Sequence, residues 1–138
     1  MDQNQSGSQK FPKGFLFGSA TSAFQTEGFN FNTDWYEWEK TGATTDGKTD
    51  HPAADSWHKW PEDIELLKQT NQNAYRFGVE WARIEPEEGK FDEDAIEHYR
   101  QILQTLKKDN ITSMVTLHHF TLPLWLSKKG GFLNKRFG

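Results

Sequence analysis

Polar side chains that could bind a ligand or transfer a proton follow three short apolar segments of the sequence. Gln25 and Glu27 follow the first segment, Glu80 follows the second, and the pair His118 and His119 follows the third. Two glutamates in such positions could act as a general acid and a general base. We favour hydrogen bonds or salt bridges over acid/base chemistry for both glutamates.

The two adjacent histidines invite a second interpretation, which is a metal site. Neighbouring residues on a strand point to opposite faces, and the sequence supplies no third ligand close to them. We therefore expect no metal ion here. His119 is expected to face a pocket, and His118 is expected to have a structural role.

Arg76 is the exception in an otherwise apolar segment. Residues 73–86, NAYRFGVEWARIEP, include a run at 74–79 with the length and the aromatic and β-branched content of a buried strand. A guanidinium is always charged and is rarely buried without an anion beside it. The sequence therefore predicts that a carboxylate or phosphate lies next to Arg76.

The elements that would position these residues alternate between strands and helices. Strands are expected at residues 15–21, 74–79 and 112–117. Gly18 in the first strand would allow close approach of a neighbouring backbone. Helices are expected at residues 55–70, with Pro61 starting a second helical segment, and from the cap residue Asp92 to Lys108. This order predicts an α/β fold of right-handed parallel β/α units.

Apolar residues three or four positions apart mark the face of each helix that should be buried. They are Trp57, Trp60, Ile64 and Leu67 in the first helix, and Ile96, Tyr99, Leu103 and Leu106 in the second. Trp81 and Trp125 are also expected to pack in the core. A sheet of three such units would leave both edge strands without a neighbour, which favours association with another chain segment.

The remaining segments are expected to be loops and turns. Residues 29–52 show no sustained period, so we predict a long loop in which Trp35 and Trp38 could line an outer cleft. The second strand should run out through residues 80–86. Residues 122–126 should form a short apolar turn, and Asn134 should cap a further helix.

The composition excludes several classes of function. The 16 basic and 20 acidic residues give a net charge of -4 without a basic face, so nucleic-acid binding is not expected. No cysteine occurs, which excludes disulfides and thiolate metal sites. No apolar run approaches the ~20 residues of a membrane span. We expect a flexible polar leader at residues 1–10, a folded region at 11–138, and a cytoplasmic location.

Aromatic side chains are frequent, with six tryptophans and eleven phenylalanines making up most of an aromatic share of 14%. Large flat rings serve protein cores first, but they also bind ligands that have apolar faces. Sugars are one such ligand. The excess of rings therefore agrees with a carbohydrate-binding function.

Three motifs in order carry a family resemblance: FLFGSATSAFQTEG, NAYRFGVEWARIEP and VTLHHFTLPLWL. Together they resemble the first three β/α units of glycoside hydrolase family 1, the β-glucosidase and β-galactosidase family, from about Phe11 to the end of the chain. The resemblance implies a partial (β/α)₈ TIM barrel. It also implies hydrolysis of β-glycosides with retention by two glutamates, one after strand four and one on strand seven, with carboxyls about 5 to 5.5 Å apart. Neither segment is present here.

The resemblance implies roles for individual residues as well. Gln25 and His119 match residues that hydrogen-bond sugar hydroxyls in the −1 subsite, and Arg76 matches the arginine that holds the nucleophile carboxylate. Phe120 stands where many members have a tryptophan, so it would offer only apolar contact to the substrate. Glu80 stands where a serine is common. No catalytic residue is expected in this chain, and the family needs no metal or organic cofactor.

We therefore expect the N-terminal part of a retaining β-glycosidase that is inactive by itself. Its partners would be a β-linked glucoside or galactoside and the remaining barrel segment. The sequence does not choose among glucose, galactose and a 6-phosphosugar. Two alternatives stay open. One is an interaction subunit of a split barrel completed by another chain or by self-association, and the other is a non-catalytic carbohydrate-binding module.

Overall fold

The computed structural model describes residues 10–49 and 51–135. Within them, three parallel strands form one sheet in the order β1-β2-β3. The strands are β1 (Gly18–Ala20), β2 (Ala74–Gly78) and β3 (Thr112–Thr116). Helix α3 (Ser56–Gln69) lies between β1 and β2 in the sequence, and α5 (Glu93–Lys108) lies between β2 and β3. The prediction of parallel β/α units is confirmed.

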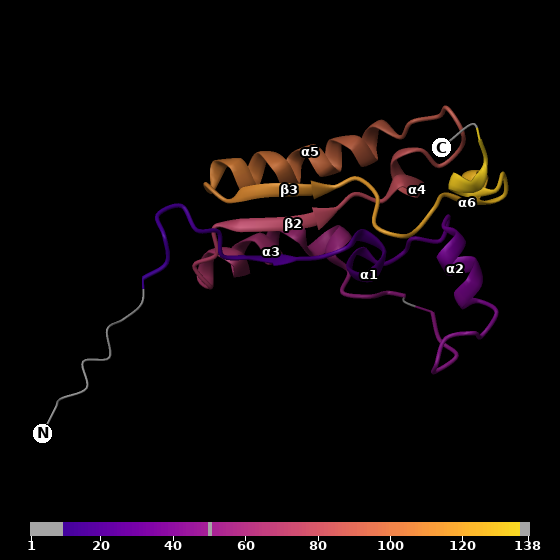
Figure 1. Ribbon diagram of the computed structural model, residues 1–138, viewed down its shortest axis with the longest axis horizontal. Helices are drawn as coiled ribbons and strands as arrows, with labels where there is room; N and C mark the ends of the chain where they lie inside the picture. The colour runs from indigo at the N-terminus through magenta and orange to yellow at the C-terminus, as the bar shows by residue number, and fades with distance from the viewer. Residues whose placement is uncertain (1–9, 50, 136–138) are drawn as a thin grey trace, which may run out of the picture.

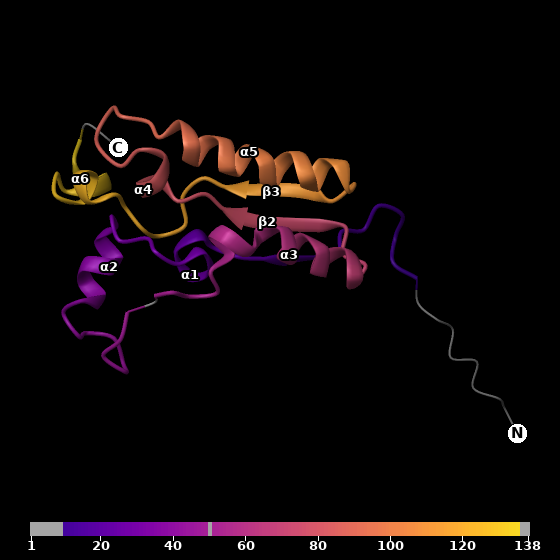
Figure 2. The ribbon, with the colours of Figure 1, turned by 180° about the vertical axis from the view of Figure 1, so that it is seen from behind.

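The core lies between one face of the sheet and the two long helices, α3 and α5 (Figures 1 and 2). Its buried members are Ile64, Leu67, Phe77, Tyr99, Ile102, Leu106 and Ile111. The predicted face of α3 is correct. On α5 the buried residues are Ala95, Tyr99, Ile102 and Leu106, whereas Ile96 and Leu103 are only half-buried. The buried stripe is therefore rotated by part of a turn from the predicted one.

The opposite face of the sheet has no helix packed on it among the described residues. Side chains alternate along a strand, so Phe77 points into the core and Arg76 points away from it. Arg76 is paired in register with Met114, which is 57% exposed. This face, which we call the open face, is therefore an exposed part of the sheet.

Strand β1 is shorter than predicted: only Phe17 among the described residues before it binds the backbone at the start of β2, and Phe15 and Phe17 also bind the Asn73 side chain. The Asn73 side chain accepts the N–H of Phe17 at 2.7 Å and donates to the carbonyl of Phe15 at 3.1 Å. The expected close approach at Gly18 is present. A Cβ atom there would lie 2.3 Å from the carbonyl oxygen of Ala74, so only glycine fits.

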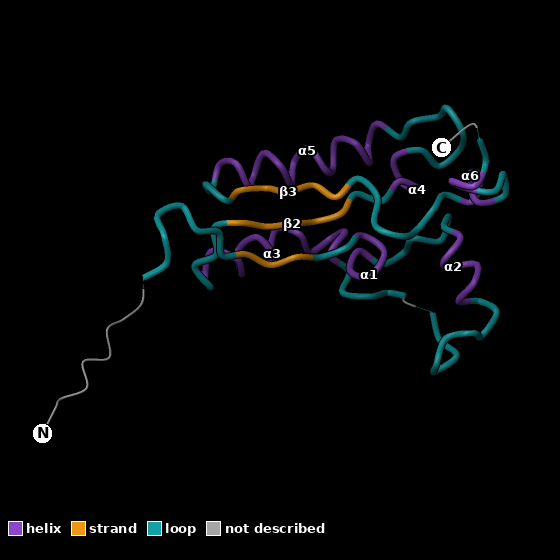
Figure 3. The backbone as a smooth tube through the Cα atoms, viewed as in Figure 1, coloured by secondary structure: helices purple, strands orange, loops and turns teal. Residues whose placement is uncertain are grey.

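Four short helices gather at the carboxyl ends of the strands (Figures 1 and 3). They are α1 (Ala23–Glu27), α2 (Asp34–Glu39), α4 (Trp81–Ile84) and α6 (Leu124–Ser127). Two of them correct the predictions. Helix α2 lies inside the predicted loop, where Thr33 caps it by accepting the N–H of Tyr36. Helix α4 replaces the expected strand extension, because the Glu80 side chain caps its first turn at Ala82.

Smaller differences concern helix continuity and the chain ends. Pro61 lies inside the single helix α3, in its second turn, and does not divide it. Asn134 follows a short 3₁₀ helix, η1 (Gly131–Leu133). The helix expected after Asn134 and most of the polar leader at residues 1–10 lie outside the described residues.

Candidate functional site

The three segments that follow β1, β2 and β3 lie together at the carboxyl ends of the strands (Figure 1). These segments carry the candidate site residues that the sequence predicted. A narrow pocket there is lined by Ser22 and Phe24 after β1, by Glu80 after β2, and by His119 and Phe120 after β3. Carboxyl ends of parallel strands are where α/β proteins place their ligands. We therefore treat this edge as the candidate site.

The three residues predicted to bind substrate lie around this pocket. Phe120 is half-buried, with its ring centroid 5.9 Å from that of Phe24. His119 is exposed, and its ring lies 5.3 Å from that of Phe120. Gln25 follows Phe24 on α1, is exposed, and accepts a hydrogen bond from the Ser22 hydroxyl, although it does not line the pocket itself. Their contact with a sugar stays a prediction.

Arg76 was expected in a buried strand, and the family resemblance placed its anionic partner, the nucleophile carboxylate, in a segment that is not part of this chain. The Arg76 side chain is exposed on the open face, and none of the described residues forms an ion pair with it. The apolar run around it predicted burial because such runs usually lie in sheets covered on both faces. Here the described residues cover only one face. Its guanidinium is thus available to an anion.

An aromatic surface beside the pocket comes from the helix that the sequence did not predict. Helix α2 places the ring of Trp35 5.0 Å from Phe120 and 4.8 Å from Trp38. Both tryptophans are about two-fifths exposed. Indole faces are good contacts for the apolar face of a sugar ring. The Trp35 ring therefore lies beside the candidate site. Its predicted role in lining an outer cleft stays a prediction.

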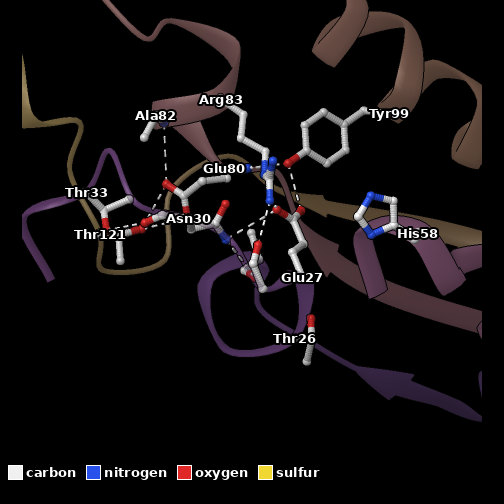
Figure 4. Close-up of polar contacts among 12 residues, drawn as sticks. Thr26, Glu27, Asn30, Thr33, His58, Glu80, Ala82, Arg83, Tyr99 and Thr121 are labelled. Carbon is white, nitrogen blue, oxygen red and sulfur yellow. Dashed lines mark hydrogen bonds and ion pairs between the residues drawn. The ribbon is translucent and has the colours of Figure 1, made fainter. Parts of the chain in front are cut away.

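A buried polar network lies directly behind the site (Figure 4). Glu27 accepts hydrogen bonds from Arg83 Nε at 2.9 Å and from the Tyr99 hydroxyl at 2.7 Å. Arg83 also donates to the carbonyl of Gly28 at 2.6 Å and stacks on the ring of Trp57. The arginine with a buried anionic partner is therefore Arg83.

Glu80 forms the other half of this network. Its carboxyl accepts the Thr121 hydroxyl, which lies 3.1 and 3.0 Å from its two oxygens, and its backbone N–H donates to the Tyr99 hydroxyl at 2.9 Å. Tyr99 thus joins Glu80 to Glu27 (Figure 4). Both glutamates act through hydrogen bonds and an ion pair, as predicted.

Burial controls the protonation of the two carboxyls. It raises the pKa of Glu27, while the charge of Arg83 opposes the rise. It raises the pKa of Glu80 to about 7, with the Thr121 hydrogen bond opposing. The two side chains belong to residues that are only 6% and 2% exposed. Both carboxyls are bound to other residues of the network, which agrees with a supporting role for them.

His98 gives a testable pH dependence. It stacks on Trp57 with ring centroids 3.7 Å apart, and burial, aided by the charges of Arg83 and His58, lowers its pKa to about 4 from 6.5. The folded chain therefore binds fewer protons at this site than the unfolded chain between these pH values, so its stability falls as the pH drops from 6.5 to 4. The raised pKa of Glu80 acts in the opposite direction, with stability falling as the pH rises from 4.5 to about 7.

We expect His98→Phe to retain the stack on Trp57 and to remove the part of the acid sensitivity that His98 causes. Urea unfolding at pH 7 and pH 4.5 should show a smaller loss of stability in the variant than in the wild type. The matched control is His118→Phe, which changes an exposed histidine and should reproduce the wild-type loss. An unchanged loss in His98→Phe would contradict the assignment.

Neither a metal site nor a membrane span is found in the described part of the chain. No group of histidine, aspartate and glutamate side chains in residues 10–49 and 51–135 could hold a metal ion. The His118 ring instead packs 5.0 Å from that of Phe132. No helix in these ranges has the length and apolar character needed to cross a membrane.

Comparison with known families and proteins gives one consistent result. The profile of "Glycosyl hydrolase family 1" matches residues 7–137. A 1,4-beta-D-glucan glucohydrolase from Thermotoga neapolitana is 38% identical over 134 residues, which are 92% of this chain and 32% of that protein. The chain thus spans about a third of the length of the curated relatives that it matches.

Solved structures extend the similarity to the fold. A beta-glycosidase from Pyrococcus horikoshii has a TM-score of 0.86 and 48% identity, covering 93% of this chain and 30% of that one. A beta-glucosidase from Thermotoga maritima in complex with deoxynojirimycin has a TM-score of 0.87 and 38% identity, covering 91% and 30%. The three-stranded sheet therefore corresponds to part of a larger structure in each neighbour.

Proposed function

The chain belongs to glycosyl hydrolase family 1, and on this basis we propose that it is the N-terminal segment of a retaining β-glycosidase acting on β-glucosides or β-galactosides. The names of the relatives, which include a beta-glucosidase, favour glucosides. The segment supplies one side of the sugar site, and the remaining barrel supplies the two catalytic glutamates. By itself the chain is inactive.

The observation that carries this proposal is the position of Arg76. Its guanidinium is exposed on the open face of the sheet, with no anion beside it among the described residues. A guanidinium binds carboxylates through paired N–H donors. Arg76 therefore holds the nucleophile carboxylate, which comes from the rest of the barrel and reaches the open face.

The other residues of the site bind and orient the sugar. Gln25 and His119 are exposed at the carboxyl edge, where an amide and an imidazole can hydrogen-bond sugar hydroxyls. Phe120 and Trp35 offer ring faces to the apolar side of the sugar. In the retaining reaction the nucleophile carboxylate bonds to the anomeric carbon while the acid glutamate protonates the leaving oxygen. This chain supplies neither group.

The test is reconstitution of activity from two polypeptides. The 138-residue chain and a polypeptide supplying the remaining strands are assayed with an aryl β-glucoside, alone and mixed, and light scattering gives the mass of each species. We expect hydrolysis only in the mixture, together with a one-to-one complex. In the mixture, Gln25→Ala should lower kcat/KM by about tenfold, the effect of one lost hydrogen bond.

A matched control is Gln104→Ala, since Gln104 is also exposed but lies on α5 away from the site. It should leave the mixture as active as the wild type. Hydrolysis by the single chain at the rate of the mixture would refute the proposal, and so would an inactive one-to-one complex. Light scattering of the chain alone would also reveal the alternative, a self-associated assembly.

A further inference from the structure

We propose that Glu80 is a positioning residue, whose carboxyl holds the segment bearing His119 and Phe120 in place through Thr121. The proposal rests on the proposed function, because it concerns two side chains assigned to sugar binding. It adds a role for a buried carboxyl that takes no part in the reaction itself.

The segment after β3, residues 118–121, is held in place by few hydrogen bonds. Residues 118–121 make no backbone hydrogen bond to any of the described residues. Within the described part of the chain, the side chains of residues 118–121 make hydrogen bonds only through the Thr121 hydroxyl, which binds both oxygens of Glu80. The backbone is fixed again at Leu122, which pairs with Asp34. The position of His119 and Phe120 between these points therefore depends on Thr121 and on ring contacts.

Burial of the Glu80 carboxyl costs free energy, because few groups around it stabilise its charge. The Glu80 side chain is fully buried. Among the described residues, its carboxyl has one hydrogen-bond partner besides Thr121, the N–H of Ala82 at 3.4 Å, and the charges of Glu27 and Arg83 act on it from nearby. The nearby cation Arg83 is bound to Glu27 and Gly28. Burying a carboxyl without a direct cationic partner disfavours folding. The cost of burying the carboxyl therefore offsets much of what its hydrogen bonds to Thr121 and Ala82 contribute to stability.

Glu80 connects the segment after β3 to helix α1 through hydrogen bonds. Its backbone N–H binds Tyr99, and Tyr99 binds Glu27, which lies on the same short helix as Gln25 (Figure 4). Glu80 thus links the third connection, with His119, to the first, with Gln25. The two predicted hydrogen-bonding partners of the sugar are therefore held at a fixed separation by one buried chain of hydrogen bonds.

The charged and titratable groups around Glu80 come from every element packed on it. Glu27 on α1 raises its pKa, Arg83 on α4 lowers it, and the Thr121 hydrogen bond lowers it. Tyr99 lies on α5, and both His118 and His119 line the same pocket as Glu80. Removing the Thr121 hydroxyl should therefore raise the pKa of Glu80 further above about 7, which a ¹³C carboxyl titration by NMR would measure.

The decisive measurement is the backbone order of residues 118–121 in the 138-residue chain, from ¹⁵N relaxation at pH 8. We expect backbone N–H order parameters of about 0.85 in the wild type and below about 0.6 in Thr121→Val. Thr121→Ser keeps the hydroxyl and should restore the order. Thr105→Val, a half-buried threonine on α5 outside the network, is the matched control and should change nothing at 118–121.

A second variant guards against loss of the fold. Glu80→Leu breaks the same link and removes the buried charge but leaves the Thr121 hydroxyl and the Ala82 N–H unpaired, so the urea midpoint at pH 8 should change little while residues 118–121 become disordered. If Glu80 only capped α4, the order parameters would fall at residues 82–84 and would stay unchanged at residues 118–121. Unchanged order at 118–121 in both Thr121→Val and Glu80→Leu would overturn the proposal.

The reconstituted barrel separates this proposal from the proposed function. There, Thr121→Val should lower kcat/KM by about tenfold, and Thr121→Ser should recover it. Disorder at 118–121 with an inactive wild-type complex would support the positioning role and refute the glycosidase assignment. An active complex with wild-type kinetics in Thr121→Val would refute the positioning role alone.

Discussion

Replacing Arg83 with methionine is expected to lower the free energy of unfolding by about 3 to 5 kcal/mol, the cost of leaving one buried charge without its partner. Arg83 and Glu27 are 2.9 Å apart and largely buried. In the variant Glu27 would keep only the hydrogen bonds from Tyr99 and Asn30. Methionine retains apolar contact with Trp57, so the loss would report the missing charge together with the hydrogen bond from Arg83 to the carbonyl of Gly28.

Urea unfolding of the chain at pH 7 would measure this loss. Arg100→Met is the matched control, because Arg100 also pairs with a glutamate, Glu97, but the pair is about half exposed. An exposed pair contributes less than about 1 kcal/mol. A double variant, Glu27→Leu with Arg83→Met, should recover part of the loss. Equal effects of Arg83→Met and Arg100→Met would show that the buried pair has no special role.

The second large effect is expected at Arg76, in catalysis and not in folding. In the reconstituted barrel, Arg76→Met should lower kcat by about 10² to 10³-fold, the usual effect of removing one fixed electrostatic contact to a reacting group. The physical reason is that the nucleophile carboxylate would lose the cation that keeps it ionised and in place. Arg76 is exposed in the chain described here, so the substitution should not weaken the sheet.

Steady-state kinetics on an aryl β-glucoside would test this prediction, with light scattering to show that the variant still forms the complex. Arg76→Lys keeps the charge without the paired N–H donors and should fall between the wild type and Arg76→Met. Arg100→Met lies on α5 outside the site and should be fully active. A fully active Arg76→Met complex would contradict both the role of Arg76 and the proposal built on it.

The features that the sequence predicted well are those determined by local interactions. Helix α5 begins and ends where expected, because the Asp92 carboxylate accepts the N–H of Ala95 at 3.0 Å and the terminal charges oppose the dipole. Gln25, His119 and Phe120 were identified by motif; His119 and Phe120 line one pocket, Gln25 lies on α1 next to Phe24 of that pocket, and their binding of a sugar stays a prediction. Motif order and the strand/helix alternation were sufficient for this.

The features that the sequence did not predict depend on residues far apart in the chain. Helix α2 has only six residues, too few for a periodic pattern, and it is fixed by the N–H of Leu122 binding Asp34 across 88 positions. The role of Thr121 has no signal in its residue type, since it depends on a partner 41 positions away. The exposure of Arg76 was missed because an apolar run shows that a strand is buried without showing on how many faces.

The composition of the core has a consequence for the order in which the molecule opens. No residue of β1 belongs to the core cluster, and all three of its residues are exposed, whereas Phe77 of β2 is one of the buried members and Val115 of β3 packs against them. Releasing β1 would therefore expose less apolar surface than releasing either other strand. Local unfolding should begin at β1, and the helix that carries Gln25 would be the first part of the sugar site to lose its position.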